Sequence, residues 1–366
     1  MALYQTLAFL FVLSGVVFVH ELGHFLVARW CGVKVLAFSI GFGRELFGFV
    51  DKHGTRWKFC LIPLGGYVKM LGDEDAASAR TDKAAVATDP RHAFPTQPVW
   101  ARMAIVAAGP AFNMIFAILV YAAVFVGVGQ PTTRPIVGQV LPHSAAELAG
   151  LQAGDRFISI DGKAISRFEQ VRQITQLSID RTMQVTVDRA GRQLTIPVQP
   201  RVIERTDRFG DVERTPLMGV TASGETVIER QGPVTALVSA TQVTGGIIKD
   251  TFVAIGQMVR GVRGSDEIGG PIRIAEASAH AAAAGVLPLI TMMAFLSVNL
   301  GLINILPIPL LDGGHLLFYA FEVVRGRPLP ERVQDFGLKI GVGLVGALMI
   351  FATWNDISRY LARWLS

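Results

Sequence analysis

Four long apolar segments alternate with polar stretches along the 366-residue chain. They cover about residues 5–28, 101–128, 286–311 and 336–354, and each is near the roughly 20 residues that a helix needs to cross a bilayer. The pattern therefore predicts four membrane spans. Two prolines interrupt the third segment near residue 307, so we expect an irregular end there, which is tolerated at membrane depth where it lines a cavity.

The region between the first two spans shows a strand pattern. Residues 38–43 and 57–62 are rich in aromatic and β-branched side chains, and the polar turn 51–54 separates them. We therefore expect a membrane-associated β-hairpin within a loop of about residues 35–70.

The long segment between the second and third spans predicts a β-rich soluble domain at 129–200. Short strands alternate there with glycine turns, and we expect a helix at about 167–177 and a hairpin around Ala190–Gly191. A connecting segment, 201–285, contains an expected amphipathic helix at about 230–262 that would lie on the membrane surface.

These elements predict a polytopic α-helical membrane protein of about four spans, with one membrane-associated β-hairpin region and one β-rich soluble domain. Two of the spans lie in residues 1–128 and the other two in residues 286–366. The composition agrees with this mixture, because 51% hydrophobic residues and a mean hydropathy of +0.43 are too apolar for a typical soluble protein and too polar for spans alone.

Basic residues predict the orientation of the spans, because they gather in cytoplasmic loops. The loops after the first and third spans are expected in the cytoplasm, which places both termini and the segment 129–285 outside. The basic residues that decide this are Arg29, Lys34, Arg44, Lys52, Arg56, Lys58 and Lys69 after the first span, and Arg325, Arg327 and Arg332 after the third. No cluster of basic and aromatic residues suggests nucleic-acid binding. Cys31 and Cys60 both fall on the reducing side, so we expect no disulfide.

The first apolar segment contains three ionisable residues, His20, Glu21 and His24. Such groups are costly in hydrocarbon and indicate a functional site. Residues four apart share one face of a helix, so the two histidines can bind one metal ion with the carboxylate beside them. The H-E-x-x-H spacing is typical of zinc hydrolases in which the glutamate is the general base. A solvated surface helix is the alternative, and the apolar neighbours on both sides argue against it.

A catalytic zinc ion usually takes three protein ligands. Asp312, which ends the third apolar segment and precedes Gly313 and Gly314, is the best candidate for the third. The alternatives are that Asp312 caps the next helix, or that His315 is the ligand instead.

Three asparagines lie in the spans. Asn299 and Asn304 could donate hydrogen bonds to a developing oxyanion, or could bond between helices. For Asn113 we favour interhelical packing.

Taken together, these residues resemble the site-2 protease family of intramembrane zinc metalloproteases, and most closely its bacterial RseP branch. The motifs that carry the resemblance occur in order along nearly the whole chain, at residues 20–24, 38–43, 62–70 and 297–315. The resemblance implies a zinc ion bound by His20, His24 and Asp312, with Glu21 as the base.

By the same resemblance, Asn304 contacts substrate near the metal, and Gly65, Gly66 and Tyr67 belong to a membrane-re-entrant β-loop. A strand edge in this loop could bind an unwound substrate by β-addition, although a hairpin with no substrate role is equally open. Residues about 130–200 look like a PDZ domain that faces the periplasm, and 269–272 matches a motif before the third span. RseP-type enzymes commonly carry two such domains, whereas 201–229 is too short for a second.

The resemblance implies regulated intramembrane proteolysis at the bacterial inner membrane, with the active site near the cytoplasmic side. Its expected partners are single-span membrane proteins, such as anti-sigma factors and remnant signal peptides, the lipid bilayer, and a peptide ligand of the PDZ domain. The alternative is a non-catalytic, PDZ-bearing membrane adaptor with structural zinc or none. A structural site normally has four protein ligands, and only three good candidates are present. A zinc transporter would need further polar ligands in the second and fourth spans.

Overall fold

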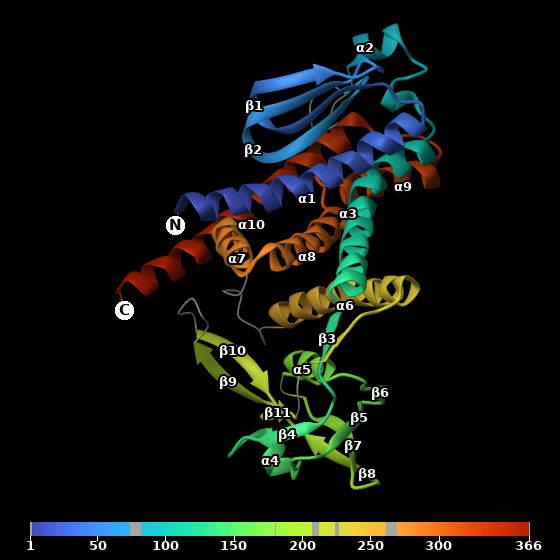
Figure 1. The fold of residues 1–366 in the computed structure, drawn as a ribbon. Coiled ribbons are helices and arrows are strands. Elements are labelled where there is room, and N and C mark those ends of the chain that lie inside the picture. Colours follow the sequence, from blue (N-terminus) through green and yellow to red (C-terminus); the bar gives the residue numbers. More distant parts are fainter. Residues whose placement is uncertain are drawn as a thin grey trace. The chain divides into compact units, whose positions relative to one another are not determined.

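The computed structural model describes residues 2–73, 82–179, 181–206, 212–223, 227–260 and 269–365. Four of the described helices are long and apolar enough to cross a membrane, which confirms long apolar helices at the four predicted positions. They are α1 (Ala2–Trp30), α3 (Val99–Gly127), α8 (Val286–Ile305) and α10 (Glu331–Leu365) (Figure 1).

The third span ends at Ile305, earlier than the expected 311. Proline removes a backbone donor and fixes φ, so Pro307 and Pro309 end the helix, and an irregular loop leads into α9 (Asp312–Arg325). The irregular end that the prolines predicted is therefore present.

The chain divides into two compact units, which we describe separately. The first contains Met1–Tyr121, Ala240–Ile248 and Gly269–Asp356. Its shorter helices are α2 (Lys83–Thr88), a 3-10 turn at Phe94–Thr96, and α7 (Pro271–Ala284).

The expected hairpin forms in the first unit, but its strands are longer than predicted. β1 (Val35–Val50) and β2 (Arg56–Met70) pair antiparallel and bend at left-handed glycines such as Gly41. Residues 35–40 pair with 66–70, and 45–50 pair with 56–60. The segment 66–70 therefore lies at one edge of the sheet.

Aromatic side chains attach this sheet to α1. Phe25 of α1 contacts Phe38 and Trp57 of the sheet, with ring centroids 5.5 and 5.2 Å apart, and Phe38 stacks on Trp57 at 4.3 Å. Phe38 is fully buried. Such aromatic pairs stabilise beyond the area that they bury, so they hold the loop against the helix that carries the histidines.

Small residues allow the spans of this unit to pack closely. A Cβ on Gly23 of α1 would lie 2.4 Å from the carbonyl oxygen of Ala108 on α3. A Cβ on Gly301 of α8 would lie 3.0 Å from the carbonyl oxygen of Pro110. Both contacts bring helix backbones together in the way that is typical of membrane helices.

The second unit contains Ala122–Ser239, Lys249–Ile268 and Ile357–Ser366. Its largest sheet has the strand order β6-β5-β7-β8, formed by Lys163–Ala164, Arg156–Ile160, Met183–Arg189 and Arg192–Val198. The turn between β7 and β8 consists of Ala190 and Gly191, both at positive φ, which confirms the predicted hairpin and matches the primed turns that such loops prefer. The predicted helix is α5 (Phe168–Gln176).

The second unit also contains shorter strands from before and after residue 200. β4 (Val137–Val140) pairs with β11 (Val220–Ala222). α4 (Ala145–Ala149) packs with Val137 of β4 in the hydrophobic core of the second unit. The other pairs are β9 (Arg201–Thr206) with β10 (Val212–Leu217), and β3 (Gln130–Thr132) with β12 (Val227–Glu229). Strand pairing thus continues into the expected connecting segment.

The expected amphipathic helix is α6 (Pro233–Val259), which exposes Val234, Leu237 and Val238. The last two residues of the expected range, 261 and 262, lie outside the described residues. Its position at a membrane surface stays a prediction.

Candidate metal centre

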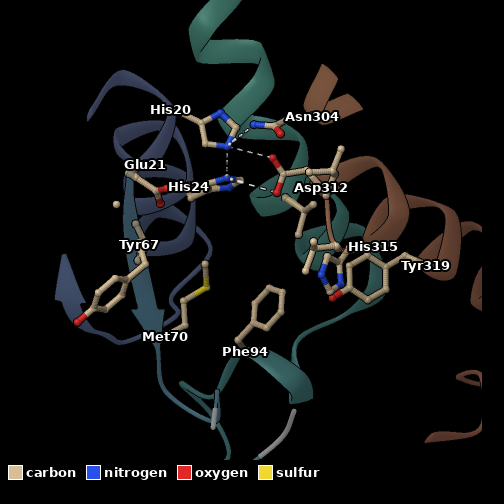
Figure 2. A pocket seen from close by; sticks show the side chains of 15 residues that line it. His20, Glu21, His24, Tyr67, Met70, Phe94, Asn304, Asp312, His315 and Tyr319 are labelled. Carbon is tan, nitrogen blue, oxygen red and sulfur yellow. Dashed lines mark hydrogen bonds and ion pairs between the residues drawn. The ribbon is translucent and has the colours of Figure 1, made fainter. Parts of the chain in front are cut away.

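The structure brings together the three residues that the sequence predicts as metal ligands (Figure 2). His20 and His24 lie one turn apart on α1, and Asp312 is the first residue of α9. Nε2 of His20 lies 3.1 Å from Oδ2 of Asp312, and Nε2 of His24 lies 3.6 Å from Oδ1. One ligand atom from each residue lies within 4.8 Å of the others.

The chemistry of these atoms fits a zinc ion. Nδ1 of His24 lies 2.8 Å from the carbonyl oxygen of Ile105, which can only accept, so Nδ1 carries the proton and Nε2 presents a lone pair. That lone pair faces Nε2 of His20 at 3.2 Å and the Asp312 carboxylate. In a tetrahedral zinc site, neighbouring nitrogen ligands lie about 3.3 Å apart. Oδ2 of Asp312 is buried and accepts no hydrogen bond from the described residues.

The loop before α9 fixes the position of Asp312. Cβ atoms on Gly313 and Gly314 would lie 2.1 Å from the carbonyl oxygen of Leu306 and 2.4 Å from that of Ile308, so only glycines allow this approach. Leu310 has a φ of 107°, a conformation that costs energy for a residue with a Cβ. The N-cap of α9 is Leu311, so the alternative reading of Asp312 as that cap is wrong.

A cavity of about 210 Å³ opens beside the three predicted ligands. Glu21, Gly66 and Tyr67 line it together with Asn304 and His315 (Figure 2). A Cβ on Gly66 would lie 3.2 Å from Cγ of Glu21, so the sheet edge packs directly against the glutamate next to the ligands. The predicted base and the predicted β-loop residues 66 and 67 therefore meet at one cavity.

The other predicted site residues divide into two groups. Asn304 lies next to the ligands, with Nδ2 3.3 Å from Nε2 of His20. Asn299, in contrast, donates to the carbonyl oxygen of Phe295 in its own helix and does not line the cavity. Gly65 does not line it either, and its backbone packs against the ring of Phe42. His315 lines the cavity but lies beside Tyr319, away from the three ligands (Figure 2).

An ion pair lies next to Tyr319, which lines the cavity. Arg102 of α3 donates to both carboxylate oxygens of Glu322 on α9, at 3.1 and 2.6 Å. The same guanidinium lies 4.8 Å from the centre of the Tyr319 ring. Burial raises the pKa of Tyr319 to about 12, so its hydroxyl stays protonated at neutral pH. The pair joins α3 to the helix that begins with Asp312.

Helix α3 supplies two contacts that the sequence interpretation missed. The side-chain amide of Asn113 lies 3.2 Å from Nδ1 of His20, and the residue is fully buried. A Cβ on Gly109 would lie 2.3 Å from Nε2 of His24. Both residues lie on one helix face, four positions apart, which is a signal that could have drawn attention to them. Asn113 therefore contacts a predicted ligand, in addition to packing between helices.

Comparisons with known proteins cover nearly the whole chain. A family model described as Peptidase family M50 matches residues 8–348. A relative from Agrobacterium fabrum, provisionally named a zinc metalloprotease, is 45% identical over 357 residues, which are 96% of this chain and 94% of the relative. The metalloprotease MmpA of Caulobacter vibrioides is 36% identical over 384 residues, with 98% and 96% covered.

One solved structure is similar to a smaller part of the chain. It is the PDZ domain of an SdrC-like protein from Listeria monocytogenes, with 20% identity over 27% of this chain and 94% of that domain. The TM-score of 0.20 is too low to establish a common fold.

Proposed function

Because this chain belongs to peptidase family M50 and is a zinc metalloprotease, we propose that it hydrolyses peptide bonds inside the membrane-spanning segments of single-span proteins. One observation carries the proposal. His20, Glu21 and His24 lie within Thr6–Trp30, a helix that is long and apolar enough to cross a bilayer. A catalytic centre at that position meets its substrate within the membrane.

The proposed ligands are His20, His24 and Asp312, and the proposed base is Glu21. A zinc ion bound there would polarise the scissile carbonyl group and lower the pKa of a water molecule. The Glu21 carboxylate accepts the proton of the attacking water and delivers it to the leaving amine. The Asn304 amide, beside His20, is placed to donate a hydrogen bond to the oxygen of the cleaved carbonyl group.

The sheet edge beside the cavity suggests how substrate is held. A helical substrate has its backbone groups bonded internally, so it must be opened into an extended strand before attack. Residues 66–70 pair with 35–40 along one side, and Gly66, Tyr67, Val68 and Met70 line the cavity. An opened substrate segment adds to this edge as a further strand, which brings its carbonyl groups to the metal centre.

The four spans support a multi-pass membrane protein. We place it in the inner membrane with both termini in the periplasm, from the basic residues after the first and third spans. His20 then lies about 21 Å along the first span, at 1.5 Å per residue, which is near the cytoplasmic side.

In this orientation the second unit faces the periplasm. We assign it a PDZ-type role, in which it binds a peptide or restricts access to the membrane part. Its position fits regulated intramembrane proteolysis, with substrates that were first shortened outside, such as anti-sigma factors and remnant signal peptides. Among the described residues, three ligands converge at the metal centre, which leaves a position for water and argues against a structural zinc in a membrane adaptor.

The test is cleavage of a model single-span substrate that lacks most of its outer domain, by detergent-purified protein. We expect wild type with zinc to cut it and Glu21→Gln to bind zinc without cutting, because the water loses its base. A chelator control should abolish cleavage. Glu147→Gln, on the short helix α4 of the second unit, makes the same chemical change at a residue that does not line the cavity and should cut normally. Cleavage by Glu21→Gln would refute the mechanism.

A further inference from the structure

Histidines that bind a metal through Nε2 carry their proton on Nδ1, and a partner for that proton fixes the ring and its tautomer. In His24 this partner is the carbonyl oxygen of Ile105 on α3, 2.8 Å away. A backbone oxygen cannot be removed by substitution, and it holds the His24 ring regardless of the side chain at that position. The equivalent partner of His20 is a side chain.

Nδ1 of His20 faces the amide of Asn113 at 3.2 Å. The two ends of an amide group have nearly the same shape, so its orientation follows from the hydrogen bonds that are available. With the nitrogen toward His20, Oδ1 of Asn113 is buried and has no hydrogen-bond partner among the described residues. With Oδ1 toward His20, the amide oxygen accepts the Nδ1 proton and Nε2 is left with the lone pair that a metal needs.

Asn113 is held firmly enough to act on the ring. It is fully buried, and its backbone carbonyl oxygen accepts a hydrogen bond from Oγ of Ser297 on α8 at 3.0 Å. A Cβ on Gly301 of α8 would lie 3.2 Å from Cβ of Asn113, so the two helices touch at this level. One turn earlier, the backbone of Gly109 lies against both imidazole rings. Helix α3 therefore packs directly against both histidines of the centre.

We propose that Asn113 is the positioning residue of the metal centre, in which its Oδ1 accepts the Nδ1 proton of His20 and keeps Nε2 free for zinc. The inference rests on the metal centre proposed above. It predicts that the loss of this acceptor weakens zinc binding even where the protein stays folded.

The experiment measures the zinc dissociation constant of the detergent-purified full chain by competition with a chelator, and thermal unfolding without metal. Asn113→Leu keeps the size of the side chain but has no acceptor, and Asn113→Ala avoids any clash if the leucine variant does not fold. We expect either variant to bind zinc about 10- to 100-fold more weakly, the usual effect of losing such a partner. Asn113→Asp keeps an acceptor oxygen and should bind within a few-fold of wild type.

Asn299→Leu is the matched control, because Asn299 lies in the neighbouring span, bonds within its own helix and does not line the cavity. It should leave the dissociation constant unchanged. Wild-type zinc affinity in folded Asn113→Leu or Asn113→Ala would overturn the inference and leave Asn113 a packing residue, however much the unfolding temperature falls. His20→Ala separates the two proposals: if it binds zinc as wild type does, the metal centre itself is wrong.

Discussion

Among the three proposed ligand side chains, Asp312 alone carries a negative charge, and its helix begins at that residue. The two histidines would bind a metal through uncharged nitrogens, and each has its second nitrogen beside a group on α3. The carboxylate therefore contributes most of the electrostatic attraction for a divalent ion in a largely buried site.

Asp312→Asn keeps the shape of the side chain and removes that charge. We expect its zinc affinity to fall by more than the about 10- to 100-fold typical of groups that only support a ligand. The measurement is zinc content per folded chain after dialysis against a weak chelator. Wild-type content would move the third ligand elsewhere, and His315→Ala would then be the next variant to measure.

At this scale the sequence predicted what is local or chemically costly. His20, Glu21 and His24 are close in sequence, and Asp312 stands out as a charge at the end of an apolar segment. Asn113 packs between helices as predicted, but its contact with His20 was missed, because the two residues are 93 positions apart and an asparagine in a span has many uses. Gly109 and Asn113 share one face of their helix, but this spacing points to the metal centre only once the position of the histidines is known.

The position of Asp312 depends on close contact between the backbone of α9 and the backbone at the end of α8. Gly313 lies where a Cβ would come within 2.1 Å of one carbonyl oxygen and 2.3 Å of another. The first turn of α9 can approach the end of α8 only because this side chain is missing. The position of the carboxylate is thus a property of the element as well as of the residue.

Gly313→Ala should push the first turn of α9 away from that loop. We expect zinc to bind more weakly and the free energy of unfolding to fall by about 1–3 kcal/mol, as in other overpacked sites. Gly343→Ala is the control, because a Cβ there meets nothing within 4 Å and alanine favours a helix. Chelator competition and thermal unfolding measure both variants. Equal behaviour of the two alanines would show that α9 tolerates the shift.

Elements with local signals were predicted most accurately. The β7–β8 turn is one, because two residues decide its geometry, and the bounds of the first two spans are another. The third span is shorter than predicted and the fourth is longer. The extent of β1 and β2 was underestimated, because their bent, irregular pairing depends on contacts between residues far apart in the chain. The close packing of 66–70 against Glu21 likewise follows from tertiary structure.

At the scale of the whole molecule, the proposed orientation places the second unit and the loop after α9 on opposite sides of the membrane. Gln193 of β8 and Pro328, between α9 and α10, are both exposed. In a chain whose two native cysteines are replaced, a cysteine at 193 should react with a membrane-impermeant maleimide in intact cells. A cysteine at 328 should react only after the inner membrane is opened. The reverse pattern would place the metal centre near the periplasmic side.

The sheet edge at 66–70 has a consequence for selectivity. Main-chain N–H and C=O groups are the same for every amino acid except proline, which lacks the N–H. An enzyme that binds its substrate through these groups therefore has little sequence specificity. What then distinguishes one membrane helix from another is the free energy needed to unravel it. Glycine and proline make a helix easier to unravel, and a run of leucines makes it harder. Such an enzyme would select its substrates by the stability of their membrane helices.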